Sequence, residues 1–313
     1  MAHIAFKGIK TTMKKFYFFS VIALLFSNMT SAHADLNILS CEPEWASLAN
    51  ELGGSHVTVH SATTAYQDPH HIEARPSLIA KVRRADLLIC SGAELESGWL
   101  PMLQRQANNA SVLTGKPGYF EAATQVLRLD IPKHIDRSMG DVHASGNPHV
   151  HLDPRRIKII AKALSARLAK LDTENTVYYQ QRYNDFVTRW GKSINQWEKL
   201  AEPLKGKRIV IHHRDWVYLF DWLGIEIAGT LEPKPGLPAT AGHLSKLKNT
   251  LRDNPAFLII HTPYQSNRAA RRLSKLINTN SMELPHTTGA TEQTETLFDL
   301  FETLINKLTG AIK

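Results

Sequence analysis

Cysteine is scarce in this sequence, with only Cys41 and Cys90 among 313 residues. Two cysteines are too few for a disulfide-rich scaffold or for a metal centre built from thiolates. Each follows an apolar stretch, Leu36–Leu39 in one case and Leu87–Ile89 in the other, so both are expected at strand ends in one sheet. An exported chain permits a disulfide between them, and two buried free thiols are the alternative.

Hydrophobic stretches long enough to cross a membrane are also missing. The apolar run Phe16–Phe26 is shorter than the roughly 20 residues that a spanning helix requires. Lys14-Lys15 precedes it, and Ser31–Ala34 has the small-x-small pattern of a signal-peptidase site, so a leader cleaved after this segment is expected. No cysteine stands directly after the site to receive a lipid. The mature chain is predicted to be soluble and periplasmic, with Met13 as an alternative start.

The net charge is small once the leader is removed. The whole chain carries +8, and the leader contains four lysines and no acidic residue, which leaves +4. That excess is too mild to predict a nucleic-acid partner. The mature chain, 313 minus 34 residues, is long enough for one large domain or two of ordinary size.

Motifs of hydrolytic metal sites are absent or incomplete. His-Glu-x-x-His does not occur, and His149–Asp153 begins the metallo-β-lactamase pattern His-x-His-x-Asp, but Pro154 stands where the next histidine belongs. No residue is a convincing general base beside an open metal position. The chain is therefore not expected to be an enzyme. A periplasmic zinc hydrolase is the alternative from that class, and a periplasmic zinc buffer is a further alternative outside it.

Histidines recur where apolar segments end. Two of them, His70 and His149, directly follow a proline, which fixes φ and makes a rigid loop that presents an imidazole. His213 ends an apolar run, and His286 ends another after Leu284-Pro285. Four separate segments thus each deliver a histidine at the end of an element, which is a stronger signal than one histidine in a surface loop.

The mature chain alternates strand-like and helix-like segments, which predicts an α/β fold with mainly parallel sheets flanked by helices. The expected strands of the first half are Leu36–Leu39, Val57–Val59 and Asp86–Cys90, with a helix at Pro76–Ala85. The expected strands of the second half are Arg208–Ile211, Ile225–Ala228, Phe257–Ile260 and Met282–Leu284. Its expected helices lie near Trp216–Leu223, Thr240–Arg252, Asn267–Ile277 and Thr291–Leu308.

Between the halves, Arg155–Leu200 has apolar and aromatic residues at helical intervals and a capping signature near Asp172–Glu174. A connector with an apolar face should pack on both lobes and be rigid. We therefore expect a signal peptide at 1–34, an N-terminal α/β lobe at 35–152, a helical connector at 153–204 and a C-terminal α/β lobe at 205–313. Open α/β sheets bind ligands at the carboxyl ends of their strands, so the four histidines are expected in the cleft between the lobes.

Several motifs together resemble those of the substrate-binding proteins of zinc and manganese ABC importers. They are Asp68-Pro69-His70 with Pro76-Ser77, Ala85-Asp86-Leu87 leading to Gly92–Glu96 and Trp99-Leu100, Pro148-His149 with Leu152-Asp153-Pro154, His213 with Trp216 and Tyr218, and Leu284-Pro285 with Thr288-Gly289. The resemblance covers nearly the whole mature chain. It implies two α/β lobes bridged by a rigid helix, a metal ion as the transported ligand, and a membrane permease as the partner of a monomeric receptor.

The resemblance also implies a ligand set. His70, His149 and His213 match the family's metal ligands. Many members have an acidic residue near the end of the last strand, where this chain has His286, so His286 or water is expected as the fourth ligand. His261, which ends the preceding predicted strand, is a further candidate. Imidazole ligands without thiolates favour zinc, whereas manganese prefers oxygen and is the less favoured alternative.

The other histidines and acids near these segments are expected to have lesser roles. Neighbours of the candidate ligands are expected outside the coordination sphere, because consecutive strand residues point to opposite faces: His71, His151 and His212. The histidines of the loop 133–146 are expected to be solvated chain: His134 and His143. Three carboxylates are candidates for orienting an imidazole: Glu73, Glu94 and Glu96.

Overall fold

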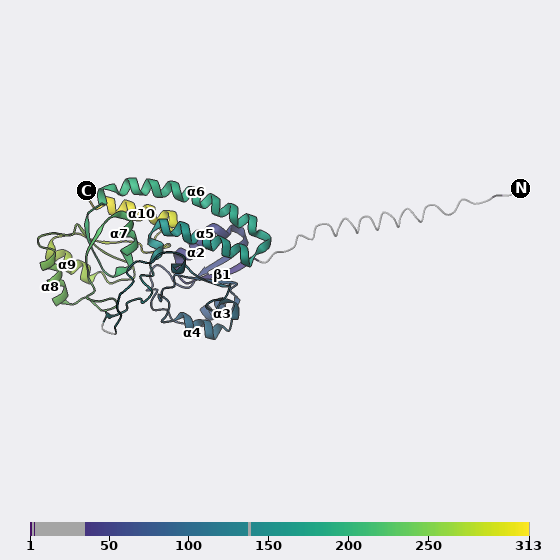
Figure 1. Ribbon diagram of the computed structural model, residues 1–313, viewed down its shortest axis with the longest axis horizontal. Helices are drawn as coiled ribbons and strands as arrows, with labels where there is room; N and C mark the ends of the chain where they lie inside the picture. Colours follow the sequence, from purple (N-terminus) through teal and green to yellow (C-terminus); the bar gives the residue numbers. More distant parts are fainter. Residues whose placement is uncertain (2, 4–34, 137–138, 313) are drawn as a thin grey trace. The chain divides into compact units, whose positions relative to one another are not determined.

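The structure is a computed structural model that describes residues 1, 3, 35–136 and 139–312 (Figure 1). Asp35–Lys313 forms one compact unit. The predicted signal peptide, with its cleavage site and the alternative start at Met13, lies almost wholly outside the described residues.

The first half of this unit is built on a sheet of four parallel strands in the order β2-β1-β3-β4. The strands are β1 Leu36–Ser40, β2 Val57–Ser61, β3 Leu87–Cys90 and β4 Tyr119–Glu121. All four residues of β3 are buried, as expected for a central parallel strand with helices on both faces. The strand β4 was not predicted, because three residues at the sheet edge carry no periodic signal.

The second half repeats this arrangement, with four parallel strands in the order β6-β5-β7-β8. The strands are β5 Arg208–Ile211, β6 Glu226–Thr230, β7 Leu258–His261 and β8 Ser281–Glu283. Their bounds agree with the predicted ranges to within two residues at each end. The prediction of two α/β lobes with mainly parallel sheets is therefore confirmed.

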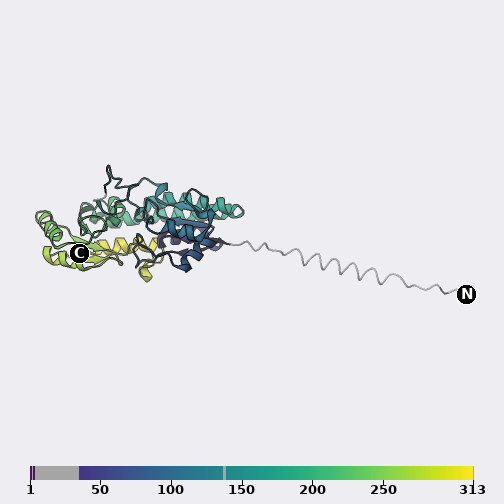
Figure 2. The ribbon, with the colours of Figure 1, turned by 90° about the horizontal axis from the view of Figure 1, so that it is seen from below.

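Helices cover both sheets. Those of the first half are α2 Pro43–Gly53, α3 Pro76–Arg84 and α4 Leu100–Ala107, and each has a proline in its first turn, where no backbone donor is lost. Those of the second half are α7 Val217–Leu223, α8 Ala241–Thr250, α9 Arg268–Ile277 and α10 Leu297–Gly310. Figures 1 and 2 show α8 and α9 at one end of the unit and α3 and α4 toward the other.

The connector consists of two helices, α5 Pro154–Leu171 and α6 Thr176–Ala201. The chain turns between them at Asp172, whose Oδ2 accepts hydrogen bonds from Tyr179 and Asn175, at the predicted interruption. The 26 residues of α6 correspond to about 39 Å of helix. It contacts α2 of the first half and α10 of the second, and it runs along both lobes in Figure 1.

Aromatic packing fixes α6 to its neighbours. The Trp190 ring is fully buried, and its centroid lies 4.7 Å from that of Phe298 and 5.5 Å from that of Phe301. Its indole Nε1 donates to the Pro154 carbonyl at 2.8 Å, so the apolar body and the polar group are both satisfied. The predicted apolar face of the connector thus packs on both lobes and belongs to the main hydrophobic core.

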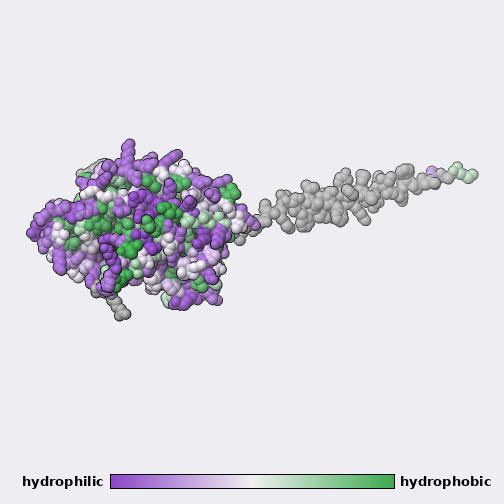
Figure 3. Space-filling model, in the orientation of Figure 1, coloured by the Kyte–Doolittle hydropathy of each residue, from purple (hydrophilic) through white to green (hydrophobic). Residues whose placement is uncertain are grey.

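Among the described residues, no helix combines the length and the apolar character needed to cross a lipid bilayer. On the face drawn in Figure 3, hydrophilic side chains are spread over much of the surface, with apolar side chains interspersed among them.

The two cysteines form a disulfide between the ends of β1 and β3, which pair directly in the first sheet. Both Cys41 and Cys90 are fully buried. Of the two alternatives open from the sequence, the structure contains the bonded form.

Removing this disulfide is expected to lower the free energy of unfolding by about 2–4 kcal/mol, because the bond closes a loop across 49 positions and so limits the unfolded chain. The double variant Cys41→Ser, Cys90→Ser should therefore unfold at lower denaturant concentration than the oxidised wild type, with unchanged metal stoichiometry. Equal unfolding midpoints for the two proteins would show that the bond contributes nothing.

Candidate metal centre

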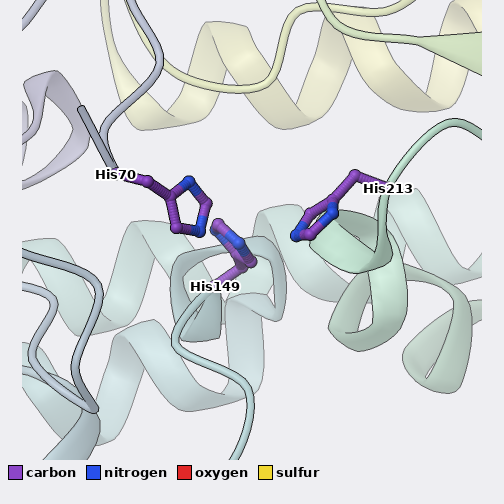
Figure 4. Close-up of side chains that lie close together, drawn as sticks. All are labelled: His70, His149 and His213. Carbon is purple, nitrogen blue, oxygen red and sulfur yellow. The ribbon is translucent and has the colours of Figure 1, made fainter. Parts of the chain in front are cut away.

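Three of the four predicted histidines come together where the two lobes meet. His70 lies in the loop after β2, His149 precedes the short 3-10 helix Val150–Leu152, and His213 lies two residues after β5. One ring nitrogen of each lies within 4.8 Å of those of the other two. Figure 4 shows the three rings converging on one point from three separate segments. The carboxyl ends of parallel strands thus supply two of the three, as the topology predicts.

His70 is held by the residue two positions before it. The Asp68 carboxylate accepts from the backbone N–H of His70 at 3.0 Å and from its Nδ1 at 2.7 Å. The loop itself is fixed by Trp99, whose indole donates to the Pro69 carbonyl at 2.9 Å. Because Nδ1 is the hydrogen-bond donor, Nε2 carries a lone pair, and this buried atom has no hydrogen-bond partner among the described residues.

His213 has the same kind of support from another segment. Its Nδ1 donates to Glu232 at 2.7 Å, and the backbone N–H of Gly236 donates to the same carboxylate oxygen at 3.1 Å. Burial lowers the pKa of His213, but the hydrogen bond with Glu232 and the charges of Asp215 and Glu232 more than offset it, so the pKa is raised from its usual value. The Glu232 contact also leaves the other ring nitrogen as the acceptor.

His149 is the most deeply placed of the three, with 1% of its surface exposed. Its backbone N–H donates to Asn147 Oδ1 at 3.0 Å, while Asn147 Nδ2 donates to the Arg214 carbonyl at 2.7 Å and so ties the loop to the second lobe. Neither ring nitrogen of His149 has a partner within the described structure. Burial, together with the neighbouring imidazoles of His286 and His70, lowers its pKa well below the usual value, so the ring is neutral.

His286 lies beside this group but is not one of the three whose nitrogens are mutually close. Its ring centroid is 5.1 Å from that of His149 and 5.0 Å from that of His151. Its buried Nε2 has no partner in the described part of the chain, and burial lowers its pKa well below the usual value. His261 is buried outside the group, and its Nδ1 lies 3.1 Å from the Thr262 carbonyl.

The histidines next to the candidate ligands lie in different environments. His71 is exposed, and His212 lines a separate cavity of about 530 Å³ at the start of α8 and α9. His151 is buried and links the lobes: its Nδ1 lies 3.1 Å from Glu44, and its Nε2 lies 3.0 Å from the His286 carbonyl. The same Glu44 carboxylate accepts from the Thr287 hydroxyl.

Two groups beside the site were not anticipated from the sequence. His143, expected in solvated loop, stacks on His70 with ring centroids 5.4 Å apart, because Ser145 of its loop donates to Glu94 through its backbone N–H and its hydroxyl. Burial lowers the pKa of His143 to about 4. Asp215 is fully buried near His213, and burial raises its pKa to about 6.

The prediction of the orienting carboxylates was wrong for Glu94 and Glu96, and Glu73 is exposed and forms no ion pair with an imidazole within the described residues. Glu94 binds Ser145, and Glu96 accepts from the backbone N–H of Gly92 at 3.1 Å. The carboxylates that hydrogen-bond imidazoles are Asp68 and Glu232, while Glu44 lies 3.1 Å from His151 Nδ1 without forming a hydrogen bond to it. Asp68 is close in sequence to its partner, whereas Glu232 and Glu44 are brought there by tertiary structure.

The cluster is reached from two cavities. One, of about 210 Å³, is lined by His70 and His213 together with Tyr264 and Gln265. The other, of about 280 Å³, is lined by His143, His149 and His213 with both apolar and polar neighbours. Tetrahedral zinc with Zn–N distances of about 2.0–2.1 Å holds its nitrogens about 3.4 Å apart. Small side-chain rotations are therefore enough for these imidazoles to share one ion.

Comparisons with known proteins agree with this architecture. Residues 38–311 match the family described as zinc-uptake complex component A, periplasmic, or ZnuA. The metal ABC transporter substrate-binding lipoprotein SloC of Streptococcus mutans is 26% identical over 271 residues, which cover 84% of this chain and 86% of that protein. The manganese ABC transporter substrate-binding lipoprotein PsaA of Streptococcus pneumoniae is 24% identical over 244 residues, covering 74% of this chain and 76% of its own.

Solved structures show the same fold. A crystal structure of ZnuA superposes with a TM-score of 0.73 at 18% identity and covers 89% of this chain and 100% of its own. A manganese-bound mutant of a periplasmic metal-binding protein from Candidatus Liberibacter asiaticus gives 0.72 at 16% identity, covering 88% and 99%. With two parallel-sheet lobes, a helical connector and a family match over almost the whole compact unit, the chain belongs to the ZnuA family and is a metal-binding substrate-binding protein of an ABC transporter.

Proposed function

We propose that this protein captures zinc in the periplasm and delivers it to the permease of an ABC importer, with His70, His149 and His213 as ligands. One observation carries the proposal: three imidazole nitrogens from three segments lie within 4.8 Å of one another. In two of the rings, a carboxylate accepts a hydrogen bond from Nδ1–H at 2.7 Å and so directs the opposite nitrogen into the cluster. Carboxylate–histidine–metal arrangements of this kind recur in metal sites.

The fourth ligand in this proposal is His286. Its Nε2 has no partner in the described structure and its ring lies beside that of His149, and both facts support this role. Its ring must rotate modestly to coordinate, because its nitrogens are not among those that lie within 4.8 Å of one another. A donor set made of imidazoles suits zinc better than manganese, which prefers oxygen. The protein would act as a monomeric carrier and not as an enzyme, since its buried imidazoles can fill the coordination sphere and leave no position for a reacting water.

Manganese is the second candidate. The relatives named for manganese support it, and so does the buried carboxylate of Asp215 close to His213, because oxygen is the donor that manganese prefers. The ratio of the zinc affinity to the manganese affinity distinguishes the two candidates, and one titration experiment measures it.

Calorimetric titration of the purified, metal-stripped protein at pH 7.5 is expected to give one zinc per molecule and at least tenfold weaker binding of manganese. The same titration on the triple variant His70→Ala, His149→Ala, His213→Ala should show no specific zinc binding. Tighter binding of manganese than of zinc would replace zinc by manganese as the cargo. Undiminished zinc binding by the triple variant would reject the site itself.

A further inference from the structure

Asp215 is a buried carboxylate that neither the fold nor the three-histidine cluster accounts for. It lies two residues after His213 and has 0% of its surface exposed. Its Oδ2 accepts from the Tyr264 hydroxyl at 3.2 Å and from Gln265 Nε2 at 3.0 Å. Its Oδ1 is also buried and has no partner among the described residues. One carboxylate oxygen is therefore held by two hydrogen bonds, and the other has none.

The charge of Asp215 also has no permanently positive partner. No lysine or arginine within the described residues forms an ion pair with it, whereas the buried Asp153 is paired with both Arg155 and Arg156. The other two carboxylates of the site are engaged by imidazoles and are partly exposed: Asp68 by 40% and Glu232 by 15% of their side chains. A buried ionised group without a partner is costly, so a cation is expected beside it.

The place where that cation belongs follows from the surroundings. Tyr264 and Gln265, which hold Asp215, line the same cavity as His70 and His213. An ion held by the three imidazoles would therefore lie close to the unsatisfied carboxylate.

We propose that Asp215 is the buried counter-charge of the metal site and makes it selective for divalent over monovalent metal ions. This inference rests on the proposed function of the cluster. Neutral imidazoles supply lone pairs but no negative charge, so an ion among them keeps its full charge in a buried place. The attraction between Asp215 and the ion is proportional to the ion's charge, and it is twice as large for a divalent ion as for a monovalent one at the same position. Asp215 acts on the ion through its charge and need not coordinate it.

The test compares Zn²⁺ with Ag⁺, a monovalent ion that also binds imidazole, in wild type and Asp215→Asn at pH 7.5. The variant keeps the size of the side chain and removes its charge. Zinc affinity is expected to fall about tenfold or more, the range for residues that support metal ligands, and silver affinity by only the square root of that factor, roughly threefold. The metal-free variant should be at least as stable as metal-free wild type, because an unmatched buried charge has been removed.

Two further variants separate charge from structure. Asp221→Asn neutralises a carboxylate that is 50% exposed on α7 and should leave both affinities unchanged. Tyr264→Phe removes one hydrogen bond from Asp215 but keeps the charge, so the ratio of zinc to silver affinity should match that of wild type. Equal proportional losses of both metals in Asp215→Asn, or no loss, would overturn the inference.

The same measurements keep this inference distinct from the proposed function. If His149→Ala abolishes zinc binding while Asp215→Asn leaves the zinc-to-silver ratio unchanged, the metal site stands and the role of Asp215 is rejected. If wild type itself binds no zinc, the proposed function fails first. If Asp215→Asn does not fold, the main contribution of Asp215 is to the stability of the fold, and the inference is rejected on that result.

Discussion

Replacing His149 with alanine is expected to weaken zinc binding by about 100-fold or more. Structural zinc sites bind with about 10–16 kcal/mol, and one of four ligands accounts for roughly 3 kcal/mol of this, which is about two factors of ten in affinity. His149 should show the full effect, because it is buried and neither of its ring nitrogens bonds to another described residue. Competition with a chromophoric zinc chelator would measure the change.

The matched control is His243→Ala. His243 is partly buried, and its Nε2 lies 2.8 Å from the Thr230 carbonyl on the second lobe, outside the three-histidine cluster. Its loss should leave zinc affinity unchanged. Similar affinities in wild type and His149→Ala would mean that the convergence of the imidazoles has no part in metal binding.

Acidification from pH 7.5 to pH 5 is expected to lower zinc affinity at least tenfold, because protons compete with the metal for imidazole nitrogen. His213 should be protonated first, since its pKa is raised above the ordinary value of about 6.5. One proton taken up there lowers the affinity roughly tenfold for each pH unit below that pKa. The Glu232→Gln variant removes the charge that raises this pKa, so its affinity should begin to fall at lower pH.

Stability of the metal-free protein should fall over the same range, and the sign follows from His149 and His286. Both have pKa values well below the ordinary one when folded. Below about pH 6.5 the unfolded chain binds protons at these rings and the folded chain does not, so unfolding is favoured as the pH drops.

For the affinity prediction, equal zinc affinity at pH 5 and pH 7.5 would contradict imidazole ligation.

The sequence was sufficient to predict the lobes and the position of the histidines along the elements. The prolines before His70 and His149 mark loops, and a parallel sheet brings the carboxyl ends of its strands to one edge. That reasoning predicts which side chains share a neighbourhood, and His286 does lie beside His149. It does not fix ring orientations, so the relation of His286 to the other three could be obtained only from the packed structure.

What escaped prediction depends on contacts between distant residues. His143 lies in a polar loop whose position is set by Ser145 and Glu94, which are 51 residues apart. Asp215 precedes the helix α7, a place where acidic residues are common because they favour the helix N-terminus, so its sequence context indicates an ordinary exposed residue. Only the arrangement of Tyr264 and Gln265 around it reveals a buried carboxylate with a free oxygen.

Anomalous diffraction at the zinc absorption edge, from crystals of the zinc-loaded protein, tests the central claim most directly. The account predicts one strong peak, with a nitrogen of His70, of His149 and of His213 each about 2.0–2.1 Å from it. A peak bonded to fewer than two of these imidazoles, or zinc bound only at some other place on the chain, would contradict it.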